Sequence, residues 1–413
     1  MRRAVYRHFA LDADAQGVEV IERRMLKADD IDPQRQKEAT AYSGLKRRLL
    51  VADMALGGLF AVLLLVSGIS AWMKALVTVY SSHPVLIVGG YFLVFFTAYG
   101  LLLLPLEYYG GFRLPHRYGL STQTLRAWLA DQAKAGVLGL GLGLIVVEVI
   151  YYVLRVVPSL WWLVTAVFML LFTVVLANVA PLVVVPLFFK LTPLTDEELV
   201  GRLMKLAERA NTRVRGVFTI NLSSKTKAAN AMVMGLGSTR RIVLGDTLYG
   251  DYGPDEIETI LGHELGHQVR HDMWWGLLFQ AALTLIGLYL AHLALSWGAG
   301  VMGLTGLDDV AGLPLLALVM GGFMTLATPL GNAFSRWRER MADEYALRIT
   351  GKPEAFVSVM VKLANQNLAQ VDPEPWVEFI LHSHPAIGKR IRRAERFEGR
   401  EMGTSEVRAA GSL

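Results

Sequence analysis

PDEIETILGHELGHQVR, residues 254–270, is the stretch that decides the fold of this 413-residue chain. Pro254 suits the first turn of a helix, and the acidic residues after it complement the positive N-terminal end of the helix dipole. Ile257, Leu261 and Leu265 recur at helical spacing and form an apolar stripe. The pattern predicts a helix that begins at Pro254 and buries one face in a core.

Two histidines and a glutamate on this helix form the pattern H-E-x-x-H. His263 and His267 stand at i and i+4, so their imidazoles share one face and can bind a single Zn²⁺, while Glu264 reaches the attacking water. The alternative is a core helix with two incidental histidines. We favour the metal site because paired histidines are uncommon beside an apolar stripe.

A zinc site of this kind needs a third protein ligand. Arg270 and Met273 stand where the short three-histidine pattern would place its remaining signature residues, which excludes that arrangement. The better candidate lies in SRWRERMAD, residues 335–343, where Glu339 and Asp343 are i,i+4 on a second predicted helix. Glu339 can bind the metal, and Asp343 can accept the N–H of a ligand histidine. Either acid alone could equally lie on a solvated face or pair with a neighbouring arginine.

The composition places this site in a membrane protein. The chain is 53% hydrophobic and has a mean hydropathy of +0.39, which is too apolar for an ordinary soluble enzyme. It contains no cysteine, which excludes disulfides and thiolate ligands. The fourth apolar run contains Pro181 and Pro186 and is expected to kink or end early. Runs of spanning length cover about 51–73, 84–106, 136–157, 160–189, 274–298 and 312–332.

The distribution of basic residues predicts the orientation of these six spans. Residues 1–50 contain eleven Lys and Arg, whereas the stretch between Met273 and Ser335 contains none. Both termini are therefore expected in the cytoplasm. This topology and attraction to anionic lipid account for the net charge of +5, and nothing calls for a nucleic-acid partner. A charged segment precedes the first span, so that span is not a cleavable signal peptide.

The expected fold class is mainly α: a helical bundle of about six spans with a protease lobe that carries a small β-sheet. The short β-branched runs Val217–Ile220 and Arg241–Leu244 are expected to pair as strands. An edge strand beside a zinc site would hold a peptide in extended form. The predicted segments are a basic N-terminus 1–50, four spans in 51–190 with a cytoplasmic loop 107–135, a lobe 191–272, a two-span hairpin 273–332, a second lobe 333–395 and a disordered tail 396–413.

Several motifs in this order resemble the CAAX prenyl protease 1 family, the integral-membrane zinc endopeptidases of the gluzincin type. The resemblance extends from about Tyr42 to Arg393, nearly the whole chain. Any one motif is weak, but their order and spacing are specific. They are Tyr109-Gly110-Gly111-Phe112, His116-Arg117-Tyr118-Gly119-Leu120-Ser121-Thr122, Trp128, Asn230-Ala231, Ile242-Val243-Leu244, Asp246-Thr247-Leu248, the HELGH pentad, the segment from Ser335 to Asp343, and Ser383-His384-Pro385 with Arg390.

The resemblance implies one Zn²⁺ and a role for each matching residue. It implies that His263, His267 and Glu339 bind zinc, with Glu264 as general base and proton donor. It further implies that Asp343 orients a ligand histidine.

Four more residues carry roles through the resemblance alone. His384 and Arg390 match the pair that the family places at the oxyanion, where positioned donors stabilise developing charge. From the residues alone, a turn histidine and one arginine of a basic run are the simpler reading of that pair. Asn230 and Ala231 match a substrate-binding edge strand, and could otherwise form a turn. The family encloses this chemistry in a chamber walled by membrane helices.

Some features depart from the family, and other functions remain open. Eukaryotic members have seven spans where six are counted here, and the composition resembles that of prokaryotic proteins, in which prenylated tails are not expected. The substrates are expected to be peptides or proteins, with C-terminal tails or prenylated peptides as candidate classes, and the expected location is a prokaryotic inner membrane. Protein quality control is a plausible role. The alternatives are a heat-shock-type membrane protease resembling HtpX, or a non-catalytic scaffold or transporter with a structural zinc. The absence of an internal repeat argues against a transporter, and the presence of Glu264 argues against a non-catalytic protein.

Overall fold

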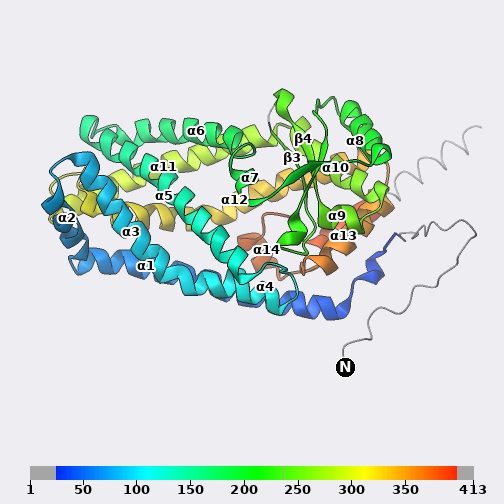
Figure 1. Cartoon of the computed structure of the whole chain (residues 1–413), viewed down its shortest axis with the longest axis horizontal. Helices are drawn as coiled ribbons and strands as arrows, with labels where there is room; N and C mark the ends of the chain where they lie inside the picture. The colour runs from blue at the N-terminus through cyan, green and yellow to red at the C-terminus, as the bar shows by residue number, and fades with distance from the viewer. Residues whose placement is uncertain (1–24, 236, 398–413) are drawn as a thin grey trace, which may run out of the picture.

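The computed structural model describes residues 25–235 and 237–397, and it shows long helices at one end of the molecule and a mixed α/β lobe at the other (Figure 1). Among the described residues, six helices are long and apolar enough to cross a membrane. The α-helices are α1 (Pro33–Val66), α2 (Ile69–Tyr80), α3 (Pro84–Glu107), α4 (Leu114–Arg117), α5 (Leu125–Val156), α6 (Trp161–Val179), α7 (Val184–Phe188), α8 (Glu197–Arg209), α9 (Asp246–Asp251), α10 (Pro254–Val269), α11 (Asp272–Val301), α12 (Leu313–Thr350), α13 (Pro353–Gln366) and α14 (Pro375–Leu381), followed by a helix over 387–397.

Three predicted boundaries differ from the observed ones. The first span breaks after Val66, where Gly68 adopts a left-handed φ of 76° and the chain turns into the short α2. The fourth apolar run ends early, as its prolines predicted: α6 stops at Val179 and only α7 follows. The predicted loop 107–135 is largely helical, because α3 continues through a π-helical turn over Tyr108–Arg113 and α5 begins at Leu125.

A four-stranded sheet lies in the lobe, with strand order β1-β2-β4-β3. Its strands are β1 (Leu191–Pro193), β2 (Val217–Ile220), β3 (Ala231–Met234) and β4 (Arg241–Gly245). The predicted pairing of the second and fourth strands is confirmed, and it is parallel, with Val217 opposite Ile242. β3 pairs antiparallel with β4 and leaves its other edge free of any described strand, next to α10.

The motif 116–122 joins the two halves of the molecule. Leu120 accepts a hydrogen bond from the backbone N–H of Lys227 at 2.9 Å, and Ser121 forms an isolated antiparallel bridge with Thr226. Within this motif, the turn that precedes Leu120 contains Gly119 in a left-handed conformation with φ 69°. The end of the helical bundle nearest the lobe is thereby tied to the lobe just before β3.

Two glycines bring α10 against α12. A Cβ on Gly262 would lie 3.3 Å from the Cα of Ala346, and one on Gly266 would lie 3.0 Å from the Cα of Ala342. Contacts this close leave no room for a side chain. These glycines immediately precede His263 and His267, so the close approach of the two backbones also brings both histidines to the acidic residues of α12.

Glu148 and Arg155 are two charged residues that lie two turns apart on the apolar helix α5. Among the described residues, no ion pair within 4.0 Å joins them. Arg155 instead donates from Nε to the carbonyl of Tyr151 at 3.1 Å. Glu148 lies against Gly89 of α3, where an added Cβ would be 3.2 Å from its Oε1.

Candidate metal centre

Three side chains from two helices converge at one point. His263 and His267 come from α10 and Glu339 comes from α12. The two Nε2 atoms are 3.1 Å apart, and the Glu339 oxygens lie 3.3 Å from that of His263 and 3.4 Å from that of His267. Among the described residues, these three form the group of side chains that could hold a metal ion.

The hydrogen-bond partners of the two imidazoles indicate that this point suits a cation. Asp343 accepts a hydrogen bond from His263 Nδ1 at 2.9 Å, and Asp272 accepts one from His267 Nδ1 at 2.8 Å. Because a carboxylate only accepts, both Nδ1 atoms carry the proton of the neutral rings, and both Nε2 lone pairs face each other and Glu339. One oxygen of Glu339 is buried without a hydrogen-bond partner among the described residues. Three converging lone pairs in a buried site fit a divalent metal.

Asp272 is a site residue that the sequence alone did not reveal. It follows His271, whose left-handed φ of 54° ends α10 and starts α11. This sharp turn directs the Asp272 carboxylate back to His267. Arg338 of α12 binds the same carboxylate and also donates to the carbonyl of Arg270 at 2.8 Å. The signal in the sequence was an acid five residues after the second histidine, which is too general a pattern to single out.

Glu264 lies on the inner side of α10, facing β3. The backbone N–H of Val233 hydrogen-bonds its carboxylate. Burial raises the pKa of Glu264 above that of an ordinary glutamate, although the neighbouring histidines oppose the shift. A partly buried carboxylate of raised pKa beside a group that could bind a metal suits proton transfer.

A cavity of about 230 Å³ opens beside these residues. It combines polar groups with an apolar wall supplied mainly by α13. The predicted residues Asn230, Ala231, His263, Glu264, His384 and Arg390 all line it. Its apolar wall comprises Phe356, Val359, Met360 and Leu363. Ala231 begins the edge strand β3, so the strand borders the cavity directly.

His384 and Arg390 approach the centre from the C-terminal segment. His384 Nε2 lies 3.3 Å from Glu339, and its side chain is 60% exposed, so it can turn towards a bound molecule. Arg390 donates to both oxygens of Asp343, at 3.0 and 2.6 Å. The structure thus places Arg390 behind Asp343, where it holds the carboxylate that orients His263.

The comparisons with known proteins agree with this architecture. The model of peptidase family M48 matches residues 193–398, and that of the CAAX prenyl protease N-terminal region, five membrane helices, matches residues 25–190. An uncharacterized metalloprotease of Bacillus subtilis, YhfN, is 32% identical over 398 residues, covering 95% of this chain and 93% of the relative. CAAX prenyl protease 1 of Saccharomyces cerevisiae is 28% identical over 313 residues, covering 70% of this chain and 68% of the relative.

A solved structure shares the fold. The crystal structure of S. mikatae Ste24p superimposes with a TM-score of 0.79 at 22% identity, covering 90% of this chain and 92% of that chain. The expected fold class and the expected family are both confirmed. This chain belongs to peptidase family M48 and is a multi-pass membrane metalloprotease that resembles CAAX prenyl protease 1.

Proposed function

We propose that this protein is an endopeptidase with one catalytic Zn²⁺ held by His263, His267 and Glu339. The observation that carries the proposal is the convergence of two imidazole nitrogens and a carboxylate beside the partly buried Glu264, at a cavity bordered by an edge strand. Zinc, when bound, supplies a Lewis acid that polarises the scissile carbonyl and acidifies a water molecule. The chain supplies the proton transfers, the orientation of the substrate and the exclusion of bulk water.

Glu264 is the group that moves the proton. As a carboxylate it takes a proton from the attacking water, and it then gives that proton to the nitrogen of the leaving amine. The raised pKa favours this role, because a carboxyl that holds the proton more tightly is the better base. The N–H of Val233 keeps the carboxylate pointed into the cavity.

Substrate binding is assigned to β3 and the groups opposite it. The free edge of β3, beginning at Ala231, can pair with an extended peptide, and Asn230 can hydrogen-bond the peptide at the same end. His384 is placed to donate to the carbonyl oxygen as charge develops there. Arg390 acts through Asp343, holding His263 in its tautomer, and adds positive charge to that side of the cavity.

The substrates are peptides or proteins, with the C-terminal tails of membrane-associated proteins as the favoured class. This preference rests on the relatives named as CAAX prenyl proteases. The cysteine-free composition, rich in Arg, Ala and Val, favours a prokaryotic inner membrane. The basic N-terminal segment and the basic lobes favour an orientation with both termini and the active site on the cytoplasmic side. The lobes 191–272 and 333–395 would then form one protease unit below the spans. Quality control of membrane proteins fits the same site and location.

The test is cleavage by purified protein of a peptide panel that includes prenylated and unprenylated tails. The wild type is compared with Glu264→Gln, which keeps the shape of the side chain and all three metal ligands. We expect the variant to bind zinc as the wild type does and to lose cleavage by a factor of at least about 10². Equal cleavage by both proteins would refute the role of Glu264, and zinc without cleavage in either would favour a structural site.

A further inference from the structure

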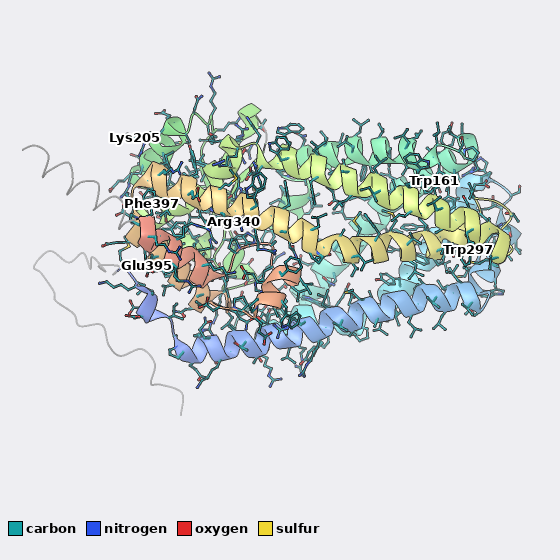
Figure 2. The ribbon with its side chains drawn as sticks, turned by 180° about the vertical axis from the view of Figure 1, so that it is seen from behind. Trp161, Lys205, Trp297, Arg340, Glu395 and Phe397 are labelled. Atoms are coloured by element: carbon teal, nitrogen blue, oxygen red, sulfur yellow. The ribbon has the colours of Figure 1, made fainter. Side chains whose placement is uncertain are left out.

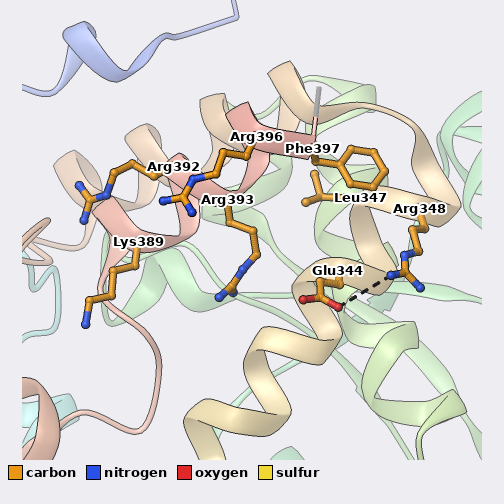
Figure 3. Close-up of a pocket in the computed structure, with 8 residues that line it drawn as sticks. All are labelled: Glu344, Leu347, Arg348, Lys389, Arg392, Arg393, Arg396 and Phe397. Atoms are coloured by element: carbon orange, nitrogen blue, oxygen red, sulfur yellow. Dashed lines mark ion pairs between the residues drawn. The ribbon is translucent and has the colours of Figure 1, made fainter. Parts of the chain in front are cut away.

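A strongly basic hollow lies on the lobe, away from the catalytic cavity. Its volume is about 410 Å³, and its walls are α12 and the helix over 387–397 (Figure 3). One acid and two apolar side chains accompany five cations there. The lining residues are Glu344, Leu347, Arg348, Lys389, Arg392, Arg393, Arg396 and Phe397.

The sequence places four of these cations on one helical face. Lys389, Arg392, Arg393 and Arg396 are spaced i, i+3, i+4 and i+7. The opposite face of the same helix packs into the core of the lobe through residues such as Ile391. Like charges at these spacings repel and destabilise a helix. A ligand of opposite charge would relieve that repulsion.

The acids nearby neutralise only part of this charge. Lys389 pairs with Glu378 at 2.6 Å, and Arg392 forms an exposed pair with Asp372 at 3.0 Å, a kind of pair that contributes little. Glu344 is 4.0 Å from Arg348.

Arg393 and Arg396 are the cations of the hollow that no nearby acid in the described part of the chain neutralises. Neither has an ion-pair partner within 4.0 Å among the described residues. Nη1 of Arg393 is also buried and finds no hydrogen-bond acceptor among them. An anion in the hollow would supply the acceptor that this donor lacks.

We propose that this hollow binds a soluble anion that carries two or more phosphate groups. Guanidinium groups offer paired donors that match phosphate oxygens, and the volume accommodates more than one phosphate. Leu347 and Phe397 add an apolar wall for an organic part of the ligand. Figure 3 shows the guanidinium of Arg393 reaching from the upper helix towards α12, on the side where Glu344 and Arg348 form the opposite wall.

The position of the hollow favours a ligand from solution over a lipid headgroup. Glu395 and Phe397 lie at the end of the molecule opposite Trp161 and Trp297, which mark the far ends of membrane helices (Figure 2). The apolar parts of the candidate membrane helices, the start of α12 included, therefore lie towards the end of the molecule opposite this hollow.

The hollow also shares its walls with the contact that supports His263. Its two walls carry the pair Asp343 and Arg390, each adjacent in sequence to a residue of the hollow, Glu344 and Lys389. An anion bound between the walls would fasten the helix over 387–397 to α12. The ligand therefore stabilises the contact that orients His263.

The experiment titrates inorganic pyrophosphate into the full-length, zinc-loaded protein in detergent, by calorimetry at fixed ionic strength. We expect saturable binding to the wild type, and binding at least about tenfold weaker to the double variant R393Q/R396Q. The matched control K205Q/R213Q removes the same charge from exposed positions of the lobe and should bind as the wild type does. R393K/R396K keeps the charge but loses the paired donors, and should also bind more weakly.

Three outcomes would overturn the proposal. They are the absence of saturable binding to the wild type, equal affinity in R393Q/R396Q, and an equal loss in the control. Addition of phosphatidylglycerol to the same micelles separates the two sources of phosphate. Displacement of pyrophosphate by that lipid would assign the hollow to a membrane headgroup and contradict a soluble ligand. None of these readouts depends on peptide cleavage, so they are independent of the proposed protease activity.

Discussion

At the scale of single residues, the metal centre depends on the carboxylates behind its ligands. Asp343 and Asp272 each hold one Nδ1–H, and each is held in turn by an arginine, Arg390 or Arg338. Four side chains that are not themselves among the proposed ligands thus hold both proposed ligand histidines in place. Such supporting groups tune metal affinity nearly as strongly as the ligands do.

Replacement of Asp272 by asparagine should weaken zinc binding. The amide lacks the charge that favours the Nδ1–H tautomer of His267 and leaves Arg338 without its buried partner. We expect zinc affinity to fall by about 10- to 100-fold, measured by competition with a chelator. Asp29→Asn, at an exposed position, is the control and should not change affinity. An unchanged affinity in Asp272→Asn would show that the contact does not support the ligand.

Asp343 could be predicted from the sequence, whereas Asp272 could not. His263, His267, Glu339 and Asp343 were predicted, because i,i+4 spacing places each pair on one helical face, and the structure brings all four together. Asp272 was missed because its reach depends on the left-handed turn at His271, a local conformation that spacing does not reveal.

At the scale of elements, the packing of α10 on α12 assembles the centre. Gly262 and Gly266 remove the side chains that would otherwise separate the helices. The same two helices contribute every ligand, so the distance between their axes sets the distance between His263 and Glu339.

Gly266→Ala should therefore destabilise the protein and the metal site together. The new Cβ would lie 3.0 Å from the Cα of Ala342, which is backbone and cannot move aside. We expect a loss of about 1–3 kcal/mol and a lower Tm in the metal-loaded protein. Gly201→Ala on α8, where an added Cβ meets nothing within 4 Å, is the control and should leave Tm unchanged or raise it. A neutral Gly266→Ala would mean that the helices can separate without cost.

The start of α10 should make stability sensitive to acid. Hydrogen bonds from Lys352 and Arg202 lower the pKa of Asp255. Burial alone would raise the pKa of Glu258, but hydrogen bonds from the same two cations outweigh it and lower that pKa too. The folded-state values lie below the unfolded ones, so this stabilisation is present above about pH 4 and is lost as pH falls further.

The measurement is the melting temperature of the wild type and Arg202→Gln between neutral and acidic pH. The difference between the two proteins should be constant near neutrality and shrink below about pH 4. A difference that does not change with pH would contradict the assigned pairing.

The sequence predicted helices and strands well where a long apolar run or a β-branched run defines the element, as for β2 and β4. It predicted the ends of helices poorly where a single glycine or a π-helical turn sets them. The break at Gly68 and the helical continuation through Tyr108–Arg113 are of that kind, because apolar composition continues across both. The predicted tail 396–413 lies almost wholly outside the described residues, as does the start of the basic N-terminus.

At the scale of the whole molecule, long membrane helices anchor the protein and a single lobe contains most of the candidate site. The spans hold the protein in the bilayer. Two of them, α11 and α12, also reach the candidate metal centre through Asp272 and Glu339. A substrate tail in or near the membrane would thus approach the cavity along the same helices that carry Asp272 and Glu339.

The proposed orientation is testable because the chain has no cysteine. A single Ser82→Cys between α2 and α3 should react with a membrane-impermeant maleimide added to intact cells. Lys205→Cys on the lobe should react only after the membrane is opened. The reason is the basic character of the lobe side. The reverse labelling pattern would place the active site outside the cytoplasm.

The central claim is that His263, His267 and Glu339 hold one zinc ion. X-ray absorption at the zinc edge of the purified Glu264→Gln protein tests it most directly, because cleavage cannot disturb the sample. We expect one zinc per chain, with two imidazole nitrogens at about 2.0–2.1 Å and oxygen ligands completing the shell, and one oxygen ligand fewer from protein in Glu339→Ala. The absence of zinc, or a shell without two imidazoles, would contradict the account.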